Sequence, residues 1–281
     1  MSDLSIYEVS PRDGLQNSSF DMSVDEKVYL VESLFHAGLD EMEVASFVNP
    51  KYVPQMAGSK EVFSQTKHLG DFGTLIPNQR GFDDAKSLGV SKFNVFFSTC
   101  EEFNRRNLNR SFDEKYRELD LMLEEVDQSD VRVYVSCAFG SPFSGLPDEH
   151  KLRDVVEKAS NLSDEVVLCD TVGTCHPTLM LRTLELVKDV DATLALHLHE
   201  NKNGSKIMSN VEAAVRWGVT KFDASVAGLG GCPFIPGSGK NLSTNEFIKW
   251  ANNNNYETGI EIDSLEEITQ LLNRKKMEVI V

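Results

Sequence analysis

Two histidines and one distant aspartate are the side chains of this sequence best suited to chemistry. His197 and His199 flank a single leucine, and Asp13 follows an apolar run near the start of the chain. Side chains two apart on a strand point to the same side, so both imidazoles would face one way. One carboxylate and two imidazoles suit a divalent transition metal or Mg2+, with positions left for water or substrate. The combination favours a metal site, whereas the His-x-His pair alone would be an ordinary pair of strand histidines.

Two charged residues and one thiol could act beside such a metal. Arg12 could stabilise an enolate or carboxylate oxygen as negative charge develops, or it could form a structural ion pair with an acid such as Glu43. Glu43 could in turn hold Arg12 or a metal ligand in place. Cys232 lies in a glycine-dense segment, residues 228–241, which is either a plain surface loop or a mobile cover for the site. A thiol there could carry a proton.

Bringing these residues together requires strands whose ends meet. Short β-branched or apolar runs recur at roughly the spacing of β–α units. Between the first two runs, the helical pattern of residues 23–37 has Ser23 as its cap and Gly38 at its end. Similar helical patterns cover residues 112–126, 179–187, 206–217 and a terminal stretch near 265–273. The predicted strands cover residues 5–9, 41–45, 72–76, 92–97, 131–137, 165–169, 193–199 and 221–226.

Eight β–α units predict an α/β fold, the (β/α)8 TIM barrel. A chain of 281 residues is long enough for two domains, but barrels of about 250 residues form one. We expect a single catalytic domain over residues 1–281, with residues 255–281 as a short C-terminal helical extension. The alternative is an open doubly wound sheet, which the lack of a G-x-G-x-x-G turn disfavours. In a closed barrel strands seven, eight and one are neighbours, which would place Asp13 near both histidines at the carboxyl ends of the strands.

The charge and cysteine content of the chain limit its partners and its compartment. Its 44 acidic and 28 basic residues give a formal net charge of −16. Such a chain repels nucleic acid and anionic membranes, so we expect neither as a partner. An anionic small molecule needs only local positive charge and stays a candidate substrate. The five cysteines form no C-x-x-C pair, and no apolar leader or membrane-spanning run is found, which predicts a reduced protein in the cytoplasm.

Several motifs follow one another along nearly the whole chain. They are EVSPRDGLQN at 8–17, SFVNPKYVPQM at 46–56, YVSC at 134–137, DTVG at 170–173, HLH at 197–199 and SVAGLGGCP at 225–233. In this order they resemble the 3-hydroxy-3-methylglutaryl-CoA lyase family of the DRE-TIM metallolyases. The last motif resembles the signature loop of that family and is highly specific for it. The resemblance implies an acyl-CoA substrate, cleaved to acetyl-CoA and acetoacetate by an enzyme that depends on Mg2+ or Mn2+. It also implies a homodimer.

The resemblance further implies roles for individual residues. The metal ligands of the family map to Asp13, His197, His199 and Asn241, of which spacing alone would not have suggested Asn241. Its catalytic residues map to Arg12, Asp170, Cys232 and Glu43. Protons could move through His197, Asp170 or Cys232. We favour His197 as the shuttle to the enolate carbon, with Cys232 ordering or closing its loop.

Three departures from the family pattern fall near strand ends. Glu200 stands where the family commonly has Asp, Asn245 begins what is usually an acidic pair, and Cys175-His176 replaces small residues. None of these changes removes a metal ligand, but such loops shape substrate choice. A sister lyase acting on a different branched 3-hydroxyacyl-CoA is therefore the nearest alternative. A Claisen-condensing synthase and a non-catalytic barrel that binds acyl-CoA or metal are the others.

Overall fold

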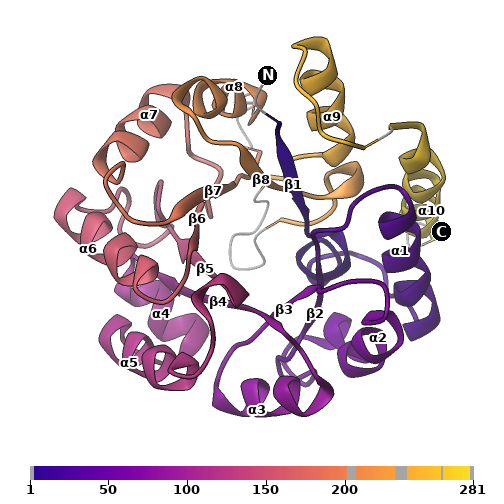
Figure 1. Ribbon diagram of the computed structural model, residues 1–281, viewed down its shortest axis with the longest axis horizontal. Helices are drawn as coiled ribbons and strands as arrows, with labels where there is room; N and C mark the ends of the chain where they lie inside the picture. Colours follow the sequence, from indigo (N-terminus) through magenta and orange to yellow (C-terminus); the bar gives the residue numbers. More distant parts are fainter. Residues whose placement is uncertain (1–2, 201–206, 232–238, 261, 279–281) are drawn as a thin grey trace.

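Eight parallel strands form one sheet that closes into a barrel inside a ring of helices (Figure 1). The computed structural model describes residues 3–200, 207–231, 239–260 and 262–278. The strand order is β1-β8-β7-β6-β5-β4-β3-β2. The two ends of this order meet through a parallel bridge between Glu8 and Met42, where the Glu8 amide donates to the Glu41 carbonyl at 2.9 Å. The predicted (β/α)8 barrel is confirmed, and the open doubly wound sheet is excluded.

Every predicted strand is present, with ends that differ from the prediction by at most two residues. The largest differences concern the ends of the second, seventh and eighth strands. The observed strands are β1 (Ser5–Glu8), β2 (Glu43–Ser46), β3 (Gly73–Leu75), β4 (Lys92–Ser98), β5 (Val131–Ser136), β6 (Glu165–Cys169), β7 (Thr193–His197) and β8 (Lys221–Ala224).

One or two helices follow each strand and cover the outside of the barrel. The last helix, α10, is the predicted C-terminal helix; it lies beside α1 (Figure 1), where Lys275 pairs with Glu26 at 2.5 Å. None of the described helices is both long and apolar enough to cross a bilayer. The helices are α1 (Val24–His36), α2 (Ser59–Thr66), α3 (Gln79–Leu88), α4 (Glu101–Leu108), α5 (Phe112–Leu123), α6 (Glu149–Ser160), α7 (Pro177–Leu186), α8 (Ile207–Trp217), α9 (Thr244–Asn253) and α10 (Glu266–Glu278).

Helix α1 begins and ends at the residues that its sequence predicts. The Ser23 hydroxyl accepts the Glu26 amide at 3.3 Å, and the Glu26 carboxylate accepts the Ser23 amide at 2.8 Å, which makes a capping box. Gly38 follows the helix with φ of 94°, a conformation that a residue with a Cβ rarely adopts. Local chemistry alone therefore sets both ends of this helix.

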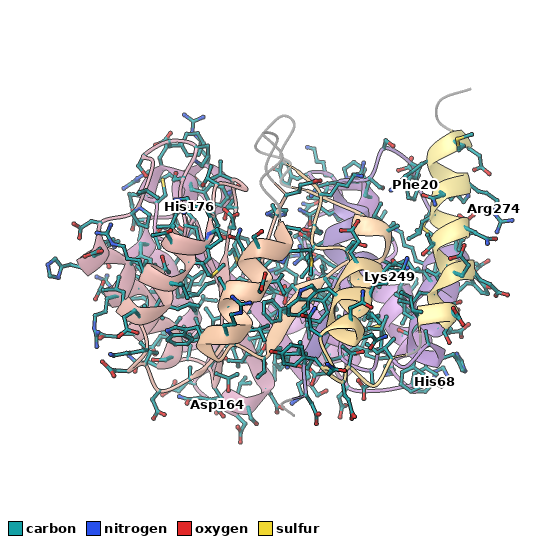
Figure 2. The ribbon with its side chains drawn as sticks, turned by 90° about the horizontal axis from the view of Figure 1, so that it is seen from above. Phe20, His68, Asp164, His176, Lys249 and Arg274 are labelled. Atoms are coloured by element: carbon teal, nitrogen blue, oxygen red, sulfur yellow. The ribbon has the colours of Figure 1, made fainter. Side chains whose placement is uncertain are left out.

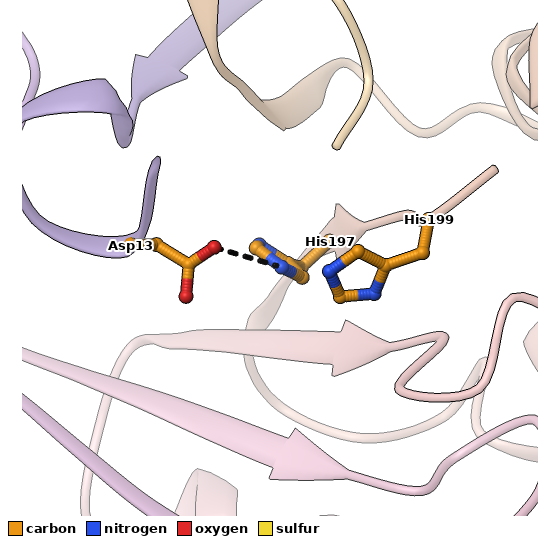
Figure 3. A group of neighbouring side chains, drawn as sticks. All are labelled: Asp13, His197 and His199. Carbon is orange, nitrogen blue, oxygen red and sulfur yellow. Dashed lines mark ion pairs between the residues drawn. The ribbon is translucent and has the colours of Figure 1, made fainter. Parts of the chain in front are cut away.

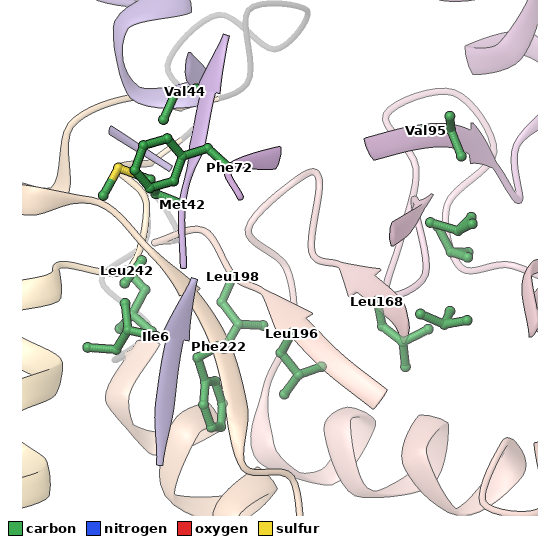
Figure 4. Close-up of a cluster of buried hydrophobic side chains, with 14 of the residues drawn as sticks. Ile6, Met42, Val44, Phe72, Val95, Leu168, Leu196, Leu198, Phe222 and Leu242 are labelled. Carbon is green, nitrogen blue, oxygen red and sulfur yellow. The ribbon is translucent and has the colours of Figure 1, made fainter. Parts of the chain in front are cut away.

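Strand residues alternate between the two sides of the barrel wall. On the outer side, Ile6, Val95 and Phe222 are at most 5% exposed and belong to one large apolar cluster beneath the helices (Figure 4). Removing this apolar surface from water is the main force that closes the barrel. On the inner side, a smaller cluster contains Tyr134, Val167, Cys169 and Ala195. Buried polar residues of the strands include Glu43, Asn94, Arg132 and Asp223.

The carboxyl ends of the strands all lie on one face of the barrel. In Figure 2, Phe20 and His176, which follow strands β1 and β6, lie on the upper side. Asp164 and His68, which precede strands β6 and β3, lie toward the lower side. The upper side is where a barrel of this kind carries its chemistry.

Glu8 fixes the first loop of this face to the last one. Its side chain is fully buried, and its carboxylate accepts the amides of Ser10 at 2.9 Å and Val226 at 3.1 Å and the hydroxyl of Thr244 at 2.6 Å. The turn after β1 is thereby tied to the turn after β8 and to the start of α9. The position of Asp13 in that first turn depends on this attachment.

We expect Glu8→Ala to lower the free energy of unfolding by at least about 2 kcal/mol, because it leaves the buried Ser10 amide and Thr244 hydroxyl without an acceptor. Urea unfolding followed by circular dichroism measures the change. Glu125→Ala, at an exposed position after α5, is the control and should change the free energy by less than about 0.5 kcal/mol. Equal stability of the two variants would contradict the proposed attachment.

Candidate metal centre and active site

Asp13, His197 and His199 meet on the upper face of the barrel. Asp13 lies in the short helical turn after β1, His197 is the last residue of β7, and His199 follows two residues later. One ligand-capable atom from each residue lies within 4.8 Å of the other two, and Asp13 Oδ2 is 4.0 Å from His197 Nε2 (Figure 3). Strand β8 pairs with both β1 and β7, as the sequence predicted.

Asn241 completes this group from the loop before α9. Its backbone pairs with that of His199 in an antiparallel bridge, and its Nδ2 donates to Asp13 Oδ2 and to the Leu229 carbonyl, both at 2.9 Å. Asn241 Oδ1 is buried and has no hydrogen-bond partner among the described residues. A buried carbonyl oxygen without a donor is costly unless a cation or another ligand takes its place. Two imidazoles, a carboxylate and an unsatisfied amide oxygen fit a divalent ion.

The protonation of His199 and Asp13 suits a metal. Burial, reinforced by the charge of His197, lowers the pKa of His199 to about 4, so its imidazole is neutral at neutral pH. His199 Nδ1 lies 2.9 Å from the Asp170 carbonyl, which leaves Nε2 as the nitrogen with a free lone pair. Burial opposes ionisation of Asp13, but the positive charges of Arg12 and His197 outweigh it and lower the pKa of that carboxyl. Neutral imidazole and ionised carboxylate are the forms that bind metal. Burial lowers the pKa of His197, but Asp223 and Asp13 outweigh that effect and raise it, so a metal ion would have to displace a proton from this imidazole.

Arg12 lies between two acids. Its guanidinium forms an ion pair with Glu43 through Nε, and its Nη1 is 2.9 Å from Asp13 Oδ1. Glu43 is fully buried and also accepts a hydrogen bond from Asn94 Nδ2 at 2.8 Å. The structural ion pair considered from the sequence is therefore present. Arg12 nonetheless lines the cavity beside Asp13, so it is held in place and available to a ligand at the same time.

Of the remaining predicted residues, Asp170 lies at the end of β6 and Cys232 lies outside the described residues. The Asp170 carboxylate accepts the amides of Thr174 at 2.9 Å and Cys175 at 3.1 Å. Its backbone carbonyl is the group that faces His199. The structure thus places the Asp170 side chain against the backbone of its own loop.

A cavity of about 240 Å³ opens beside the candidate metal centre. Arg12, Asp13 and both histidines line its polar side. Its apolar lining includes Val48, Val53, Leu75, Phe96 and Leu108. Asn107 also lines the cavity, and its Oδ1 is buried without a hydrogen-bond partner among the described residues. The cavity therefore offers a charged end, an apolar wall and an unpaired acceptor.

Sequence reasoning missed Asp223, which lies behind His197. Its side chain is buried; Oδ2 is 2.9 Å from His197 Nδ1, and Oδ1 accepts Arg132 Nη2 at 2.7 Å. Burial opposes its ionisation, but Arg132 and His197 outweigh that effect and lower the pKa of Asp223 to about 2. The available signal was its place between Phe222 and Ala224 on the eighth predicted strand, since residues on either side of it point to the opposite face.

The pKa of Asp170 predicts a pH dependence of stability. Burial raises this pKa to about 6 in the folded protein, whereas in the unfolded chain it is near 4. At a pH between these two values the folded state therefore binds more protons than the unfolded state. Stability must therefore fall as the pH rises through this interval. Between about pH 5 and about pH 7, the free energy of unfolding of the metal-free wild type should fall by about 1 kcal/mol relative to that of Asp170→Asn. Urea unfolding in the presence of chelator measures these free energies. The same change with pH in wild type and Asp170→Asn would contradict the prediction.

Comparison with known proteins agrees with this geometry. The family model described as HMGL-like matches residues 3–272. The hydroxymethylglutaryl-CoA lyase of Pseudomonas mevalonii is 36% identical over 95% of this chain and 91% of its own length. A 3-hydroxy-3-isohexenylglutaryl-CoA/hydroxymethylglutaryl-CoA lyase of Pseudomonas aeruginosa is 36% identical over 94% of this chain and 90% of its own. A solved HMG-CoA lyase from Acinetobacter baumannii, in complex with coenzyme A and 3-methylmalate, covers 98% of this chain and 92% of its own at 30% identity, with a TM-score of 0.91. The chain therefore belongs to the HMGL-like family.

Proposed function

We propose that this chain is a lyase that cleaves 3-hydroxy-3-methylglutaryl-CoA to acetyl-CoA and acetoacetate, with Mg2+ or Mn2+ at the candidate metal centre. The observation that carries the proposal is the convergence of Asp13, His197 and His199 beside Arg12 at one end of a cavity. Relatives with the lyase name at 36% identity over most of the chain support it. So does the solved relative that contains coenzyme A.

The metal ligands in this proposal are Asp13, His197, His199 and Asn241. When bound, a divalent cation supplies Lewis acidity that makes a substrate hydroxyl easier to deprotonate. The chain contributes metal-binding side chains that its own contacts already hold in place. Asp13 is held by both Arg12 and Asn241, and the backbone bridge fixes Asn241 next to His199.

Arg12 is the residue that would stabilise the developing negative charge. When the bond between C2 and C3 of the substrate breaks, its electron pair goes to the acetyl-CoA fragment, whose thioester oxygen becomes an enolate oxygen. A cation already held in place by Glu43 needs no reorganisation to meet that charge. A single well-placed donor of this kind typically lowers the barrier by about 3–4 kcal/mol.

His197 is our choice for the proton transfer to the enolate carbon. Its side chain lines the cavity, whereas the Asp170 carboxylate accepts amides of its own loop. His197 Nδ1 is held by Asp223, so a proton could be carried toward the cavity only at Nε2. The same nitrogen faces Asp13 and is the candidate metal ligand. One atom therefore has two proposed roles, which it can perform only at different moments of the reaction.

The apolar wall of the cavity favours one alternative substrate class. It shares the cavity with the charged residues, so the branch at C3 of a 3-hydroxyacyl group could extend against it. A longer alkyl branch than methyl would bury more apolar surface there. A sister lyase acting on a different branched 3-hydroxyacyl-CoA is therefore the second candidate. The isohexenyl substrate in the name of the Pseudomonas aeruginosa relative shows that such a branch occurs within the family.

Incubation with a panel of 3-hydroxyacyl-CoA thioesters, followed by mass spectrometry of the products, tests both candidates. We expect acetyl-CoA and acetoacetate from 3-hydroxy-3-methylglutaryl-CoA. Chelator should remove the activity and Mg2+ or Mn2+ should return it, because the reaction needs the Lewis acid. Turnover in excess chelator would reject the metal-dependent reaction. Turnover only of a longer-branched substrate would favour the second candidate.

Arg12→Gln should lower kcat by at least about a hundredfold, since one donor to a developing oxyanion is lost. Mn2+ should still bind, because Arg12 is not itself a proposed ligand, but its affinity should change through Asp13, which Arg12 contacts. Stopped assays of acetoacetate and calorimetric titration with Mn2+ measure the two quantities. A variant with near-normal kcat would remove Arg12 from the mechanism.

A further inference from the structure

We propose that Asp223 is a positioning residue for the metal centre: it keeps a proton on His197 Nδ1 and thereby leaves Nε2, which faces Asp13, as the nitrogen that can bind the metal. Arg132 lies on the far side of Asp223 and keeps that carboxylate ionised and fixed. The inference rests on the proposed metal site and adds to it the buried residues that orient one of its ligands.

The backbone register brings the two side chains together. His197 in β7 and Asp223 in β8 are direct partners in the parallel pairing, so both side chains point into the barrel. Asp223 Oδ2 is 2.9 Å from His197 Nδ1. A carboxylate can only accept, so Nδ1 carries the hydrogen. His197 Nε2 then faces Asp13 Oδ2, 4.0 Å away. Histidines that bind metals commonly donate their other N–H to a carboxylate in this way.

The two histidines of the site are oriented by different groups. His199 Nδ1 faces a backbone carbonyl, which is a dipole, whereas His197 Nδ1 faces a full negative charge. The rings meet nearly edge to face, with centroids 4.8 Å apart. A carboxylate behind an imidazole raises the basicity of the ligand nitrogen. Asp223 should therefore affect metal affinity through His197 alone.

Arg132 makes a buried aspartate tolerable at this position. It is 5% exposed, and its Nη2 donates to Asp223 Oδ1 at 2.7 Å. Its Nη1 donates to the Tyr134 hydroxyl at 2.6 Å, and its guanidinium carbon lies 4.0 Å from the centre of the Tyr7 ring. An unpaired carboxylate at this depth would be very costly or would take up a proton. The two oxygens of Asp223 are thus divided between Arg132 and His197.

Glu165 supplies a matched comparison for Asp223. It forms the other ion pair of Arg132, through Nε, and is itself paired with Lys221 at 2.8 Å toward the lower end of the barrel. Both acids neutralise the same buried guanidinium, but Asp223 also contacts His197. If Asp223 served only to neutralise Arg132, loss of either acid would have the same kind of effect. If it positions His197, only its loss should weaken metal binding.

Isothermal titration of the chelator-stripped, full-length protein with Mn2+ separates these cases. We expect Asp223→Asn to raise the Kd for Mn2+ by about 10- to 100-fold, the usual effect of losing such a partner. Glu165→Gln should lower the melting temperature and leave the Kd within about twofold of wild type. Wild-type affinity in folded Asp223→Asn, or equal weakening in both variants, would overturn the positioning role alone. A wild type that binds no Mn2+ would overturn the metal site and, with it, this proposal.

Two double variants keep the test decisive if Asp223→Asn does not fold because Arg132 has lost one of its two acids. Arg132→Gln with Asp223→Asn removes both charges of one pair, and Arg132→Gln with Glu165→Gln removes both charges of the other. The first should bind Mn2+ at least about tenfold more weakly than the second, because only the first loses the partner of His197. Equal Kd values for the two folded proteins would overturn the role of Asp223.

Discussion

Pairing of charges inside the barrel is the constraint on which the rest of the structure depends. Arg132 in β5 and Arg12 in the turn after β1 are both buried among carboxylates, where an isolated charge would be strongly unfavourable. Each guanidinium contacts two acids: Arg12 contacts Asp13 and Glu43, and Arg132 contacts Asp223 and Glu165. These contacts fix the side chains before any ligand arrives, since moving one group would leave another charge unpaired. The candidate metal centre is therefore preorganised by the same ion pairs that make its burial possible.

The closed topology is what allows residues from the two ends of the chain to share these pairs. The turn after β1 carries Asp13, and β7 with the residues after it carries both histidines. Strand β8 lies between them and supplies Asp223 from behind. In an open sheet of the doubly wound type, the first strand would not be next to the last. Closure thus decides the chemistry, because it turns two distant sequence motifs into neighbours on one face.

The sequence predicted those parts of the site that follow from strand ends. Asp13, His197 and His199 lie after apolar strand patterns, so a barrel brings them together by rule. Asn241 was different, because its proximity depends on a loop that returns to His199 through an isolated backbone bridge, and no local pattern indicates such a return. Asp223 and Arg132 were missed for another reason. A charged residue alternating with apolar ones usually faces water, and only the closed barrel shows that these residues face its interior.

The net charge of the buried groups around the site affects how an anionic substrate could bind there. Asp13, Glu43, Asp223 and Glu165 carry four negative charges around Arg12 and Arg132. The two guanidiniums and Lys221, the second partner of Glu165, carry three positive charges, which leaves one net negative charge when His197 is in the neutral form that binds metal. The whole chain, these residues included, carries a formal net charge of −16. A carboxylate of an acyl-CoA would meet repulsion in such a site. A divalent cation bound there would change the local sum to one net positive charge, so an ion that supplies Lewis acidity would also make an anionic substrate electrostatically acceptable.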